Sequence, residues 1–319
     1  MWVRRGVCVA AVVLGGLTVP ANAFAADLWA RSDGTNLIKE KGVTGFTQYG
    51  PGQYEATFNQ DVSGCAYLAT TSSQYTGDAS YGSVFTAGGH ASVNGVYVET
   101  KNPGGGLQDF AFNLVVQCPT TVSSIRFSVF DGDGTLVRGS PGATVTGSTG
   151  RYKSHYGRRM SSCTDIATIG AIDNTLVFNP GYVFANTGKP GNTVYIETKN
   201  PGGGLSAGYP VHTASYCSAT SAKLLGAVVD QDGTFVRGHL GVSSVRTGLG
   251  TYRVTFPRGV AGCAKIASIG AIDNTLVFNP AALDVYTGPT TTTVDVRIQN
   301  LLFFGGANFD RPFHLLVDC

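Results

Sequence analysis

Hydrophobic and polar residues alternate with a period of two along most of the chain. Residues 252–256 read apolar, polar, apolar, polar, apolar, and residues 294–298 repeat the same pattern. Glycine-containing stretches such as 248–250 separate these runs, and no window of twelve residues has the period of an amphipathic helix. Because successive side chains of a strand point to opposite faces, this pattern predicts short antiparallel strands joined by tight turns.

The pattern belongs to a sequence that repeats itself. Residues 170–180 recur letter for letter as residues 270–280, and residues 96–107 match residues 194–205 almost throughout. A tyrosine and an Asp-Gly-Thr triplet keep the same register in all three repeats, at Tyr54, Tyr152 and Tyr252 and at 33–35, 133–135 and 232–234.

We therefore divide the chain into a leader, 1–25, and three units, 26–119, 120–219 and 220–319. About eight short strands in a unit of this length predict an all-β fold of three tandem antiparallel β-sandwiches of jelly-roll type. An immunoglobulin sandwich is less expected, because the tryptophan of its core strand is missing. No linker separates the units, so we expect neighbouring units to touch, either as an extended rod or as an intramolecular pseudo-trimer.

The cysteines keep the same period. Cys8 lies in the leader, and six cysteines remain, a number that predicts a disulfide framework but allows many pairings. Three pairs that begin 98 and 100 residues apart have internal separations of 53, 54 and 56 residues. This spacing predicts one disulfide in each unit, namely Cys65–Cys118, Cys163–Cys217 and Cys263–Cys319.

The first residues have the features of a secretory signal. Arg4 and Arg5 precede an apolar run over residues 6–19, and small residues at 21–23 and 23–25 offer two cleavage sites. The apolar run is shorter than a membrane-spanning helix requires. We expect the leader to be removed and the mature protein to be secreted.

Charge excludes two classes of partner. Of 319 residues, 43% are hydrophobic and 13% are charged. Removing the leader removes two of the 22 basic residues and none of the 20 acidic residues, so the mature chain is close to neutral. It has no basic stripe for nucleic acid and no polybasic patch for an anionic membrane, and we expect neither partner.

The strings at 227–238, 250–256, 262–264 and 312–319 resemble an uncharacterised family of secreted actinobacterial proteins that carry one or more such units. The resemblance covers the mature chain and is weakest at residues 209–217. It implies secretion and a β-rich unit, and it implies no assigned activity. The Gly-x-Tyr-x-Val-x-Phe strand is also similar to the trimeric jelly rolls of complement globular heads and phage tail fibres, an analogy at the level of fold alone.

Two pairs of side chains are candidate ligand contacts. Tyr97 and Glu99, and likewise Tyr195 and Glu197, are two residues apart on predicted strands and should point off the same sheet face. An aromatic ring beside a carboxylate on an exposed sheet can bind a sugar, although it is also ordinary decoration of a solvent face.

Other motifs are better explained by structure than by chemistry. The acidic strings at 131–135 and 230–234 begin like a calcium loop but lack its later ligands, so we expect hairpin turns, no metal and no cofactor. The Asn-Pro-Gly-Gly-Gly loops at 102–106 and 200–204 lack the lysine of a phosphate-binding loop. Unit 3 has an apolar stretch, 301–304, at that position, which we expect to pack against another unit or, alternatively, to contact a partner.

The histidines do not form a catalytic pattern. His212 and His314 occupy the same position, which is Asn113 in unit 1, and strand parity places them on the face opposite the cysteines. Without a nucleophile motif nearby we expect them to bond backbone groups. His90, His155 and Asp310 occur in one unit each, so an enzyme with a single site between units would use residues of this kind.

The sequence therefore favours a secreted, non-catalytic structural or binding protein of the bacterial cell exterior. Three repeated units would give a multivalent surface for cell-wall or extracellular polysaccharide or for a protein partner. Two alternatives remain open at this stage, an extracellular hydrolase with one site between units and a dedicated carbohydrate-binding protein.

Overall fold

The computed structural model describes residues 28–73, 82–120, 124–175, 181–187, 191–273, 281–300 and 307–319. Every regular element in these ranges is a β-strand, and no helix there is long and apolar enough to cross a membrane. Three parts of the chain discussed above lie outside the described residues. They are the predicted leader, the later residues of the two identical strings (176–180 and 274–280) and the apolar stretch 301–304.

The described residues of each unit form eight strands. Those of unit 1 are β1 (Leu28–Ser32), β2 (Leu37–Lys41), β3 (Val43–Gly50), β4 (Gln53–Phe58), β5 (Ala66–Thr71), β6 (Ser83–Gly88), β7 (Gly95–Lys101) and β8 (Phe112–Gln117). Those of unit 2 are β9 (Ile125–Phe130), β10 (Leu136–Gly139), β11 (Thr144–Ser148), β12 (Arg151–His155), β13 (Thr164–Ile169), β14 (Tyr182–Thr187), β15 (Thr193–Lys199) and β16 (Val211–Tyr216). Those of unit 3 are β17 (Leu224–Val229), β18 (Phe235–Gly238), β19 (Ser243–Gly248), β20 (Thr251–Thr255), β21 (Ala264–Ile269), β22 (Ala281–Thr287), β23 (Thr293–Asn300) and β24 (Phe313–Asp318).

The strands of each unit form two four-stranded antiparallel sheets that face each other. In unit 1 the inner sheet has the order β2-β1-β8-β5 and the outer sheet the order β3-β4-β7-β6, and units 2 and 3 have the same two orders. Three hairpins per unit supply half of the neighbouring pairs, and the eighth strand returns to lie between the first and the fifth. The expected all-β fold of three sandwiches is confirmed.

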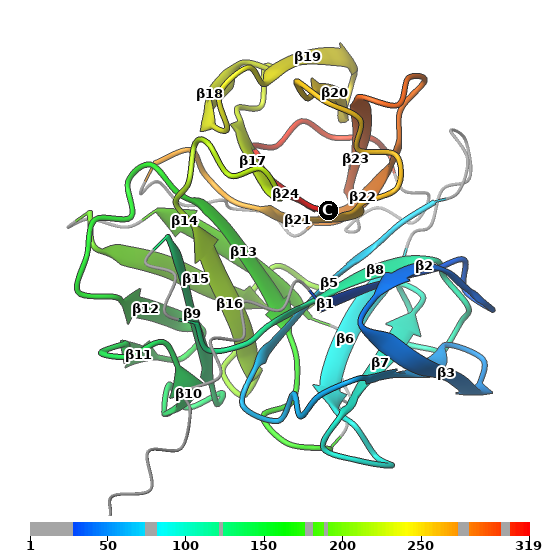
Figure 1. The fold of residues 1–319 in the computed structure, drawn as a ribbon. Helices are drawn as coiled ribbons and strands as arrows, with labels where there is room; N and C mark the ends of the chain where they lie inside the picture. The colour runs from blue at the N-terminus through cyan, green and yellow to red at the C-terminus, as the bar shows by residue number, and fades with distance from the viewer. Residues whose placement is uncertain are drawn as a thin grey trace, which may run out of the picture.

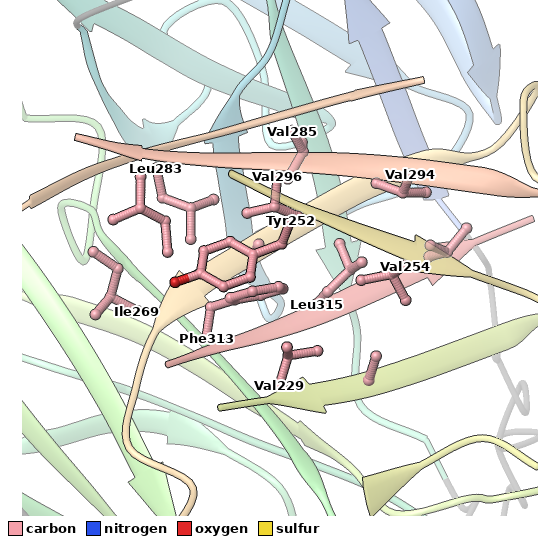
Figure 2. Packing of buried hydrophobic residues seen from close by; sticks show 14 of the residues in the cluster. Val229, Tyr252, Val254, Ile269, Leu283, Val285, Val294, Val296, Phe313 and Leu315 are labelled. Carbon is pink, nitrogen blue, oxygen red and sulfur yellow. The ribbon is translucent and has the colours of Figure 1, made fainter. Parts of the chain in front are cut away.

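The repeated tyrosine lies at the centre of each core. In unit 3 the fully buried Tyr252 ring lies 5.1 Å from the Phe313 ring, surrounded by valine and leucine side chains (Figure 2). Its hydroxyl donates to the carbonyl of Gln231 in the turn that begins β18. The hydroxyls of Tyr54 and Tyr152 donate to Gly34 and Gly132 in the same way. The tyrosine therefore fixes the Asp-Gly turn to the sandwich, which explains why both features keep one register.

The three predicted disulfides are present: Cys65–Cys118, Cys163–Cys217 and Cys263–Cys319. Each joins the residue before the fifth strand to the residue after the eighth, two strands that are neighbours in the inner sheet. Each bond therefore closes a loop that contains two of the four strands of the outer sheet.

Replacing both cysteines of unit 2, Cys163→Ala with Cys217→Ala, should lower the free energy of unfolding by about 2–5 kcal/mol, because the unfolded chain regains the freedom of a long loop. Urea denaturation of the oxidised protein measures this loss. Peptide mapping of the variant should still find the other two bonds, and a bond joining cysteines of different units would contradict the unit boundaries.

The three units form a closed ring and not a rod. Figure 1 shows the sandwiches around a common centre, where β5, β13 and β21 lie side by side. The outward faces of the three inner sheets share one apolar cluster, to which Leu68, Ile166 and Ile266 contribute from equivalent positions. The chain thus folds as an intramolecular pseudo-trimer about this axis.

Candidate functional site

The three units meet at three contact surfaces that contain buried polar groups. We call these surfaces seams 1–2, 2–3 and 3–1, after the units that they join. In seam 1–2 the His212 Nδ1 accepts the backbone N–H of Tyr67 at 2.8 Å, and in seam 2–3 the His314 Nδ1 accepts that of Asp165 at 2.9 Å. In seam 3–1 the Asn113 Oδ1 accepts the N–H of Lys265 at 3.3 Å. The prediction that these histidines bond backbone groups is confirmed, and the groups belong to the neighbouring unit.

Both histidines are fully buried, and burial lowers the pKa of each to about 3, with Arg138 and Arg237 respectively adding to the effect. Because Nδ1 accepts a hydrogen bond, the ring proton lies on Nε2, which donates to the carbonyl of Ala171 or Ala271. A neutral ring satisfies both contacts, whereas a protonated ring would place an N–H against an N–H. The histidines are therefore held neutral as structural acceptors.

A second set of three equivalent side chains lies closer to the axis. The Thr168 hydroxyl accepts the N–H of Ala69 and donates to its carbonyl. One side chain therefore bonds the edge of β5 that has no neighbouring strand in its own sheet. Ser268 bonds Ala167 in this way, and Thr70 bonds Ala267. Each unit therefore satisfies the edge strand of the preceding unit, and the third bond closes the circle.

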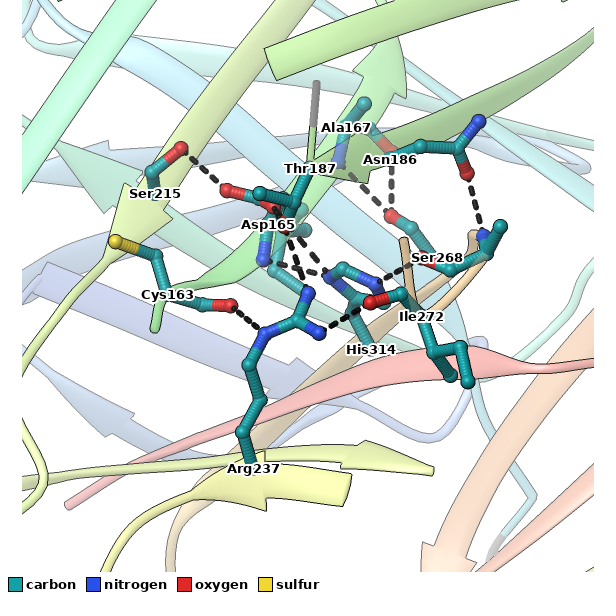
Figure 3. A network of polar contacts seen from close by, with 12 residues as sticks. Cys163, Asp165, Ala167, Asn186, Thr187, Ser215, Arg237, Ser268, Ile272 and His314 are labelled. Carbon is teal, nitrogen blue, oxygen red and sulfur yellow. Dashed lines mark hydrogen bonds and ion pairs between the residues drawn. The ribbon is translucent and has the colours of Figure 1, made fainter. Parts of the chain in front are cut away.

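An arginine enters each of two seams. Arg237 of unit 3 donates to the carbonyls of Cys163 and Ile272 and to the Thr187 hydroxyl (Figure 3). Arg138 of unit 2 donates to the carbonyls of Cys65 and Ile172 in the same way. The guanidinium thus satisfies a carbonyl of the preceding unit beside its disulfide.

What the arginine faces differs between the two seams. Arg138 lies over the Tyr67 ring, 5.3 Å from its centre. Arg237 lies near Asp165, a fully buried carboxyl that accepts the hydroxyls of Ser215 and Thr187 at 2.6 and 2.9 Å. Burial raises the pKa of Asp165, while these hydroxyls and the charge of Arg237 act in the opposite direction.

Seam 3–1 has a different arrangement. Its counterpart of Arg138 and Arg237 is Lys39, which is exposed. The carbonyl of Cys263 is bonded instead by Lys265 of the same unit at 3.0 Å, while Arg31 of unit 1 donates to Ala261 at 2.8 Å. Burial, and then the nearby charge of Arg31, lower the pKa of Lys265 to about 7.

Lys265 should make stability depend on pH. Its pKa is about 7 in the folded protein and about 10.4 in the unfolded chain, so the unfolded chain binds more protons between these values. Stability should therefore rise by a few kcal/mol from pH 7 to pH 10, at ~1.4 kcal/mol per unit of pKa difference. Denaturation of Lys265→Met should show a flatter pH profile in this range, and an unchanged slope would contradict the assignment.

The end of the axis holds a small pocket of about 90 Å³. The last residues of β5, β13 and β21 and the first residues of β6, β14 and β22 line it. In units 1 and 2 this end also carries the loop after the seventh strand, because the first residues of the sixth strand pair with its last. In unit 3 the last residue of β23 lies at the same end. The ends of all three units therefore point the same way.

The expected sugar platform of unit 1 is not exposed. Tyr97 and Glu99 do point off one sheet face, but they are only 3% and 4% exposed. The His90 ring stacks on Tyr97 at 4.1 Å, and Glu99 pairs with Lys101 at 2.9 Å. Tyr97 also belongs to an apolar cluster with Ile169 of unit 2. The prediction of an open binding face is wrong here, because side chains of unit 1 and the neighbouring unit 2 together cover it.

In unit 2 the corresponding pair is only partly accessible. Tyr195 is half-buried, whereas Glu197 is 1% exposed and pairs with Arg151 and Lys199 at 3.1 and 3.4 Å. A carboxylate with two cations of its own sheet beside it has little capacity left for a ligand. An open platform is therefore also absent from this described sheet.

The polar side chains of the acidic turns and glycine loops form hydrogen bonds with backbone groups of the same turn or loop. Asp133 accepts the N–H of Thr135 at 2.7 Å, and Asp232 that of Thr234 at 2.8 Å, as hairpin turns require. In the loop 102–106 the Asn102 side chain accepts the N–H groups of Gly104 and Gly106. Among the described residues no group of three or more His, Cys, Asp or Glu side chains could hold a metal ion.

The isolated candidates for catalysis each contact their own unit. His155 bonds the Thr146 hydroxyl at 3.1 Å, and Asp310 forms an ion pair with Arg246 at 2.7 Å, while His90 lies on Tyr97. These contacts use the side chains within their own sandwiches and do not bring them together.

Sequence reasoning missed a cavity of about 490 Å³ in unit 3. It lies among the Asp-Gly turn, the turn at 248–250 and the residues before β24, and it is lined by Gln231, Asp232, Arg246, Leu249, Phe309, Asp310 and Arg311. A signal was present in the alignment of the repeats, because Arg311 replaces Phe110 and Tyr209, the aromatic residues of the other units.

Comparison with known proteins gave no relative: no family model, no curated protein and no solved structure matches this chain.

Proposed function

We propose that the protein is a secreted, non-catalytic binding protein of the bacterial cell exterior, which presents corresponding ends of three sandwiches to one partner. The observation that carries this proposal is the closed ring, in which the histidines and hydroxyls that could serve catalysis bond backbone groups of neighbouring units. The three disulfides agree with an oxidising compartment.

The exposed loops at the axial end are the surface that we assign to binding. Leu107 and Leu205 end the two Asn-Pro-Gly-Gly-Gly loops and are 42% and 37% exposed. A partner that touches several such loops at once gains avidity from a ring that holds them at fixed separations. Extracellular polysaccharide and cell-wall material are repeating polymers, so they match a repeated surface.

The test is retention of the purified mature protein on insoluble cell walls, cellulose and chitin. We expect retention on at least one of them, with no release of soluble sugar on prolonged incubation. Release of sugar would identify a hydrolase, and absence of retention on all three would exclude the polysaccharide version of the proposal.

A further inference from the structure

One residue that lines the cavity of unit 3, Arg311, has aromatic counterparts in the other two units. In unit 1 the ring of Phe110 packs on Gly82, so closely that a Cβ at Gly82 would lie 2.5 Å from its Cδ2. In unit 2 Tyr209 packs on Gly181, where the corresponding separation from its Cζ is 2.7 Å. Both glycines directly precede the sixth strand of their unit, so the contact is part of the shared design.

Unit 3 changes both partners of this contact. Ala281 stands in place of the glycine and Arg311 in place of the aromatic residue. The guanidinium of Arg311 instead lies over the ring of Phe309, 4.0 Å from its centre, and forms part of the cavity wall. The side chain at position 311 therefore lines the cavity in unit 3, whereas its counterparts in units 1 and 2 pack on the glycine that precedes the sixth strand.

The polar groups of the cavity are fixed in place. Arg246 makes a bidentate pair with Asp310, with Nε to Oδ1 at 2.8 Å and Nη2 to Oδ2 at 2.7 Å. The Asp310 Oδ1 accepts the N–H of Gly250 at 2.8 Å and lies 3.1 Å from the Tyr252 hydroxyl oxygen. A binding group held by the backbone and by a core tyrosine does not need to be ordered again when a ligand arrives.

The lining combines this polar set with an apolar wall. Leu249 is 55% exposed, and it lines the cavity together with Phe309. Two arginines, two aspartates and Gln231 supply donors and acceptors of balanced charge. A hexose has the matching form, since its ring carries an apolar C–H face and a rim of hydroxyl groups that both donate and accept. The volume also lies within the ~300–1,000 Å³ typical of small-molecule sites.

We propose that this cavity binds a hexose unit of a neutral polysaccharide. The ring packs against Leu249, and its hydroxyls bond the guanidinium of Arg311 and the polar groups of Gln231 and Asp232. The balanced charge of the lining favours a neutral sugar over an acidic one. This inference rests on the proposed binding function and names the ligand class and the unit that recognises it.

The test is affinity electrophoresis of the full mature protein in gels that contain soluble starch, hydroxyethyl cellulose, xylan or glycol chitin. The first variant, Ala281→Gly with Arg311→Tyr, copies the Gly181–Tyr209 contact of unit 2 and should remove the Arg311 guanidinium from the cavity while keeping the fold. The second, Leu249→Ser, changes an exposed side chain. Val236→Ser is the control, because Val236 is an exposed residue of the same unit outside the cavity.

We expect the wild type and Val236→Ser to be retarded equally in at least one gel, and both cavity variants to bind roughly tenfold more weakly. Equal retardation of the wild type and the cavity variants would overturn the inference and leave the binding function standing. A wild type that is not retarded in any gel would also overturn it, and retention on insoluble cell walls would then decide the proposed function separately.

Discussion

Replacing Arg237 with alanine should destabilise the folded protein by about 3–5 kcal/mol, because two backbone carbonyls and the Thr187 hydroxyl lose a charged donor and the buried Asp165 loses a nearby positive charge. The guanidinium of Arg237 satisfies two carbonyls and the Thr187 hydroxyl, and its charge faces the fully buried Asp165. Its removal leaves the Asp165 carboxylate with hydroxyl donors alone. Urea denaturation at neutral pH measures the loss.

The ring supplies a matched control in the preceding seam. Arg138→Ala removes the same two carbonyl contacts, but Arg138 faces the neutral Tyr67 ring, so we expect a smaller loss of about 1–3 kcal/mol. Combining Arg237→Ala with Asp165→Asn should recover part of the difference, because the uncompensated charge is then gone. Equal losses for the two arginines, or no recovery in the double variant, would contradict a role for the Asp165 charge.

Sequence reasoning predicted the features that are local or that repeat. The period of two predicted strands because a strand alternates its faces whatever its partner. The cysteine pairs followed from equal spacing, since three similar units form their bonds in the same place. Strand parity also placed His212 and His314 correctly, on the face that points away from the disulfide.

The contacts between units could not be read in this way. His212 bonds a residue 145 positions earlier, and no local pattern indicates which surface covers a strand face. Tyr97 and Glu99 show the consequence, because their alternation was correct and their exposure was not. The cavity of unit 3 was missed for another reason. One of its lining residues, Arg311, differs between the repeats, whereas the predictions rested on what the repeats share.

The seams also show how a duplicated unit became a ring with three distinct contacts. Equivalent positions hold Tyr67, Asp165 and Lys265. The carbonyl of the first cysteine of each unit accepts a hydrogen bond from a cationic side chain, which is Arg138 in seam 1–2, Arg237 in seam 2–3 and Lys265 in seam 3–1. Identical subunits could not differ in this way, because any substitution would appear in all three seams. Fusion into one chain allows each seam to be optimised separately and frees one unit to carry a cavity of its own.

Acid should open the ring, because His212 and His314 must take up protons that the folded structure excludes. Their pKa is about 3 when folded and about 6.5 when unfolded, so stability is fully present above pH 6.5 and falls as the pH drops toward 3. At pH 4 each histidine should cost ~3 kcal/mol, at ~1.4 kcal/mol per unit of pKa difference.

Unit 1 shows which substitution isolates this effect, since Asn113 makes the equivalent bond without titrating. The double variant His212→Asn with His314→Asn should lose some stability at pH 7.5, because asparagine fills less of the buried space. Between pH 6.5 and pH 4, however, it should lose several kcal/mol less than the wild type, because the two buried histidines no longer take up protons on unfolding. Asn113→His should do the reverse and add a third acid-sensitive contact in seam 3–1. Urea midpoints at pH 7.5, 5.5 and 4 decide the matter, and parallel pH profiles for wild type and double variant would show that the two histidines do not control the acid response.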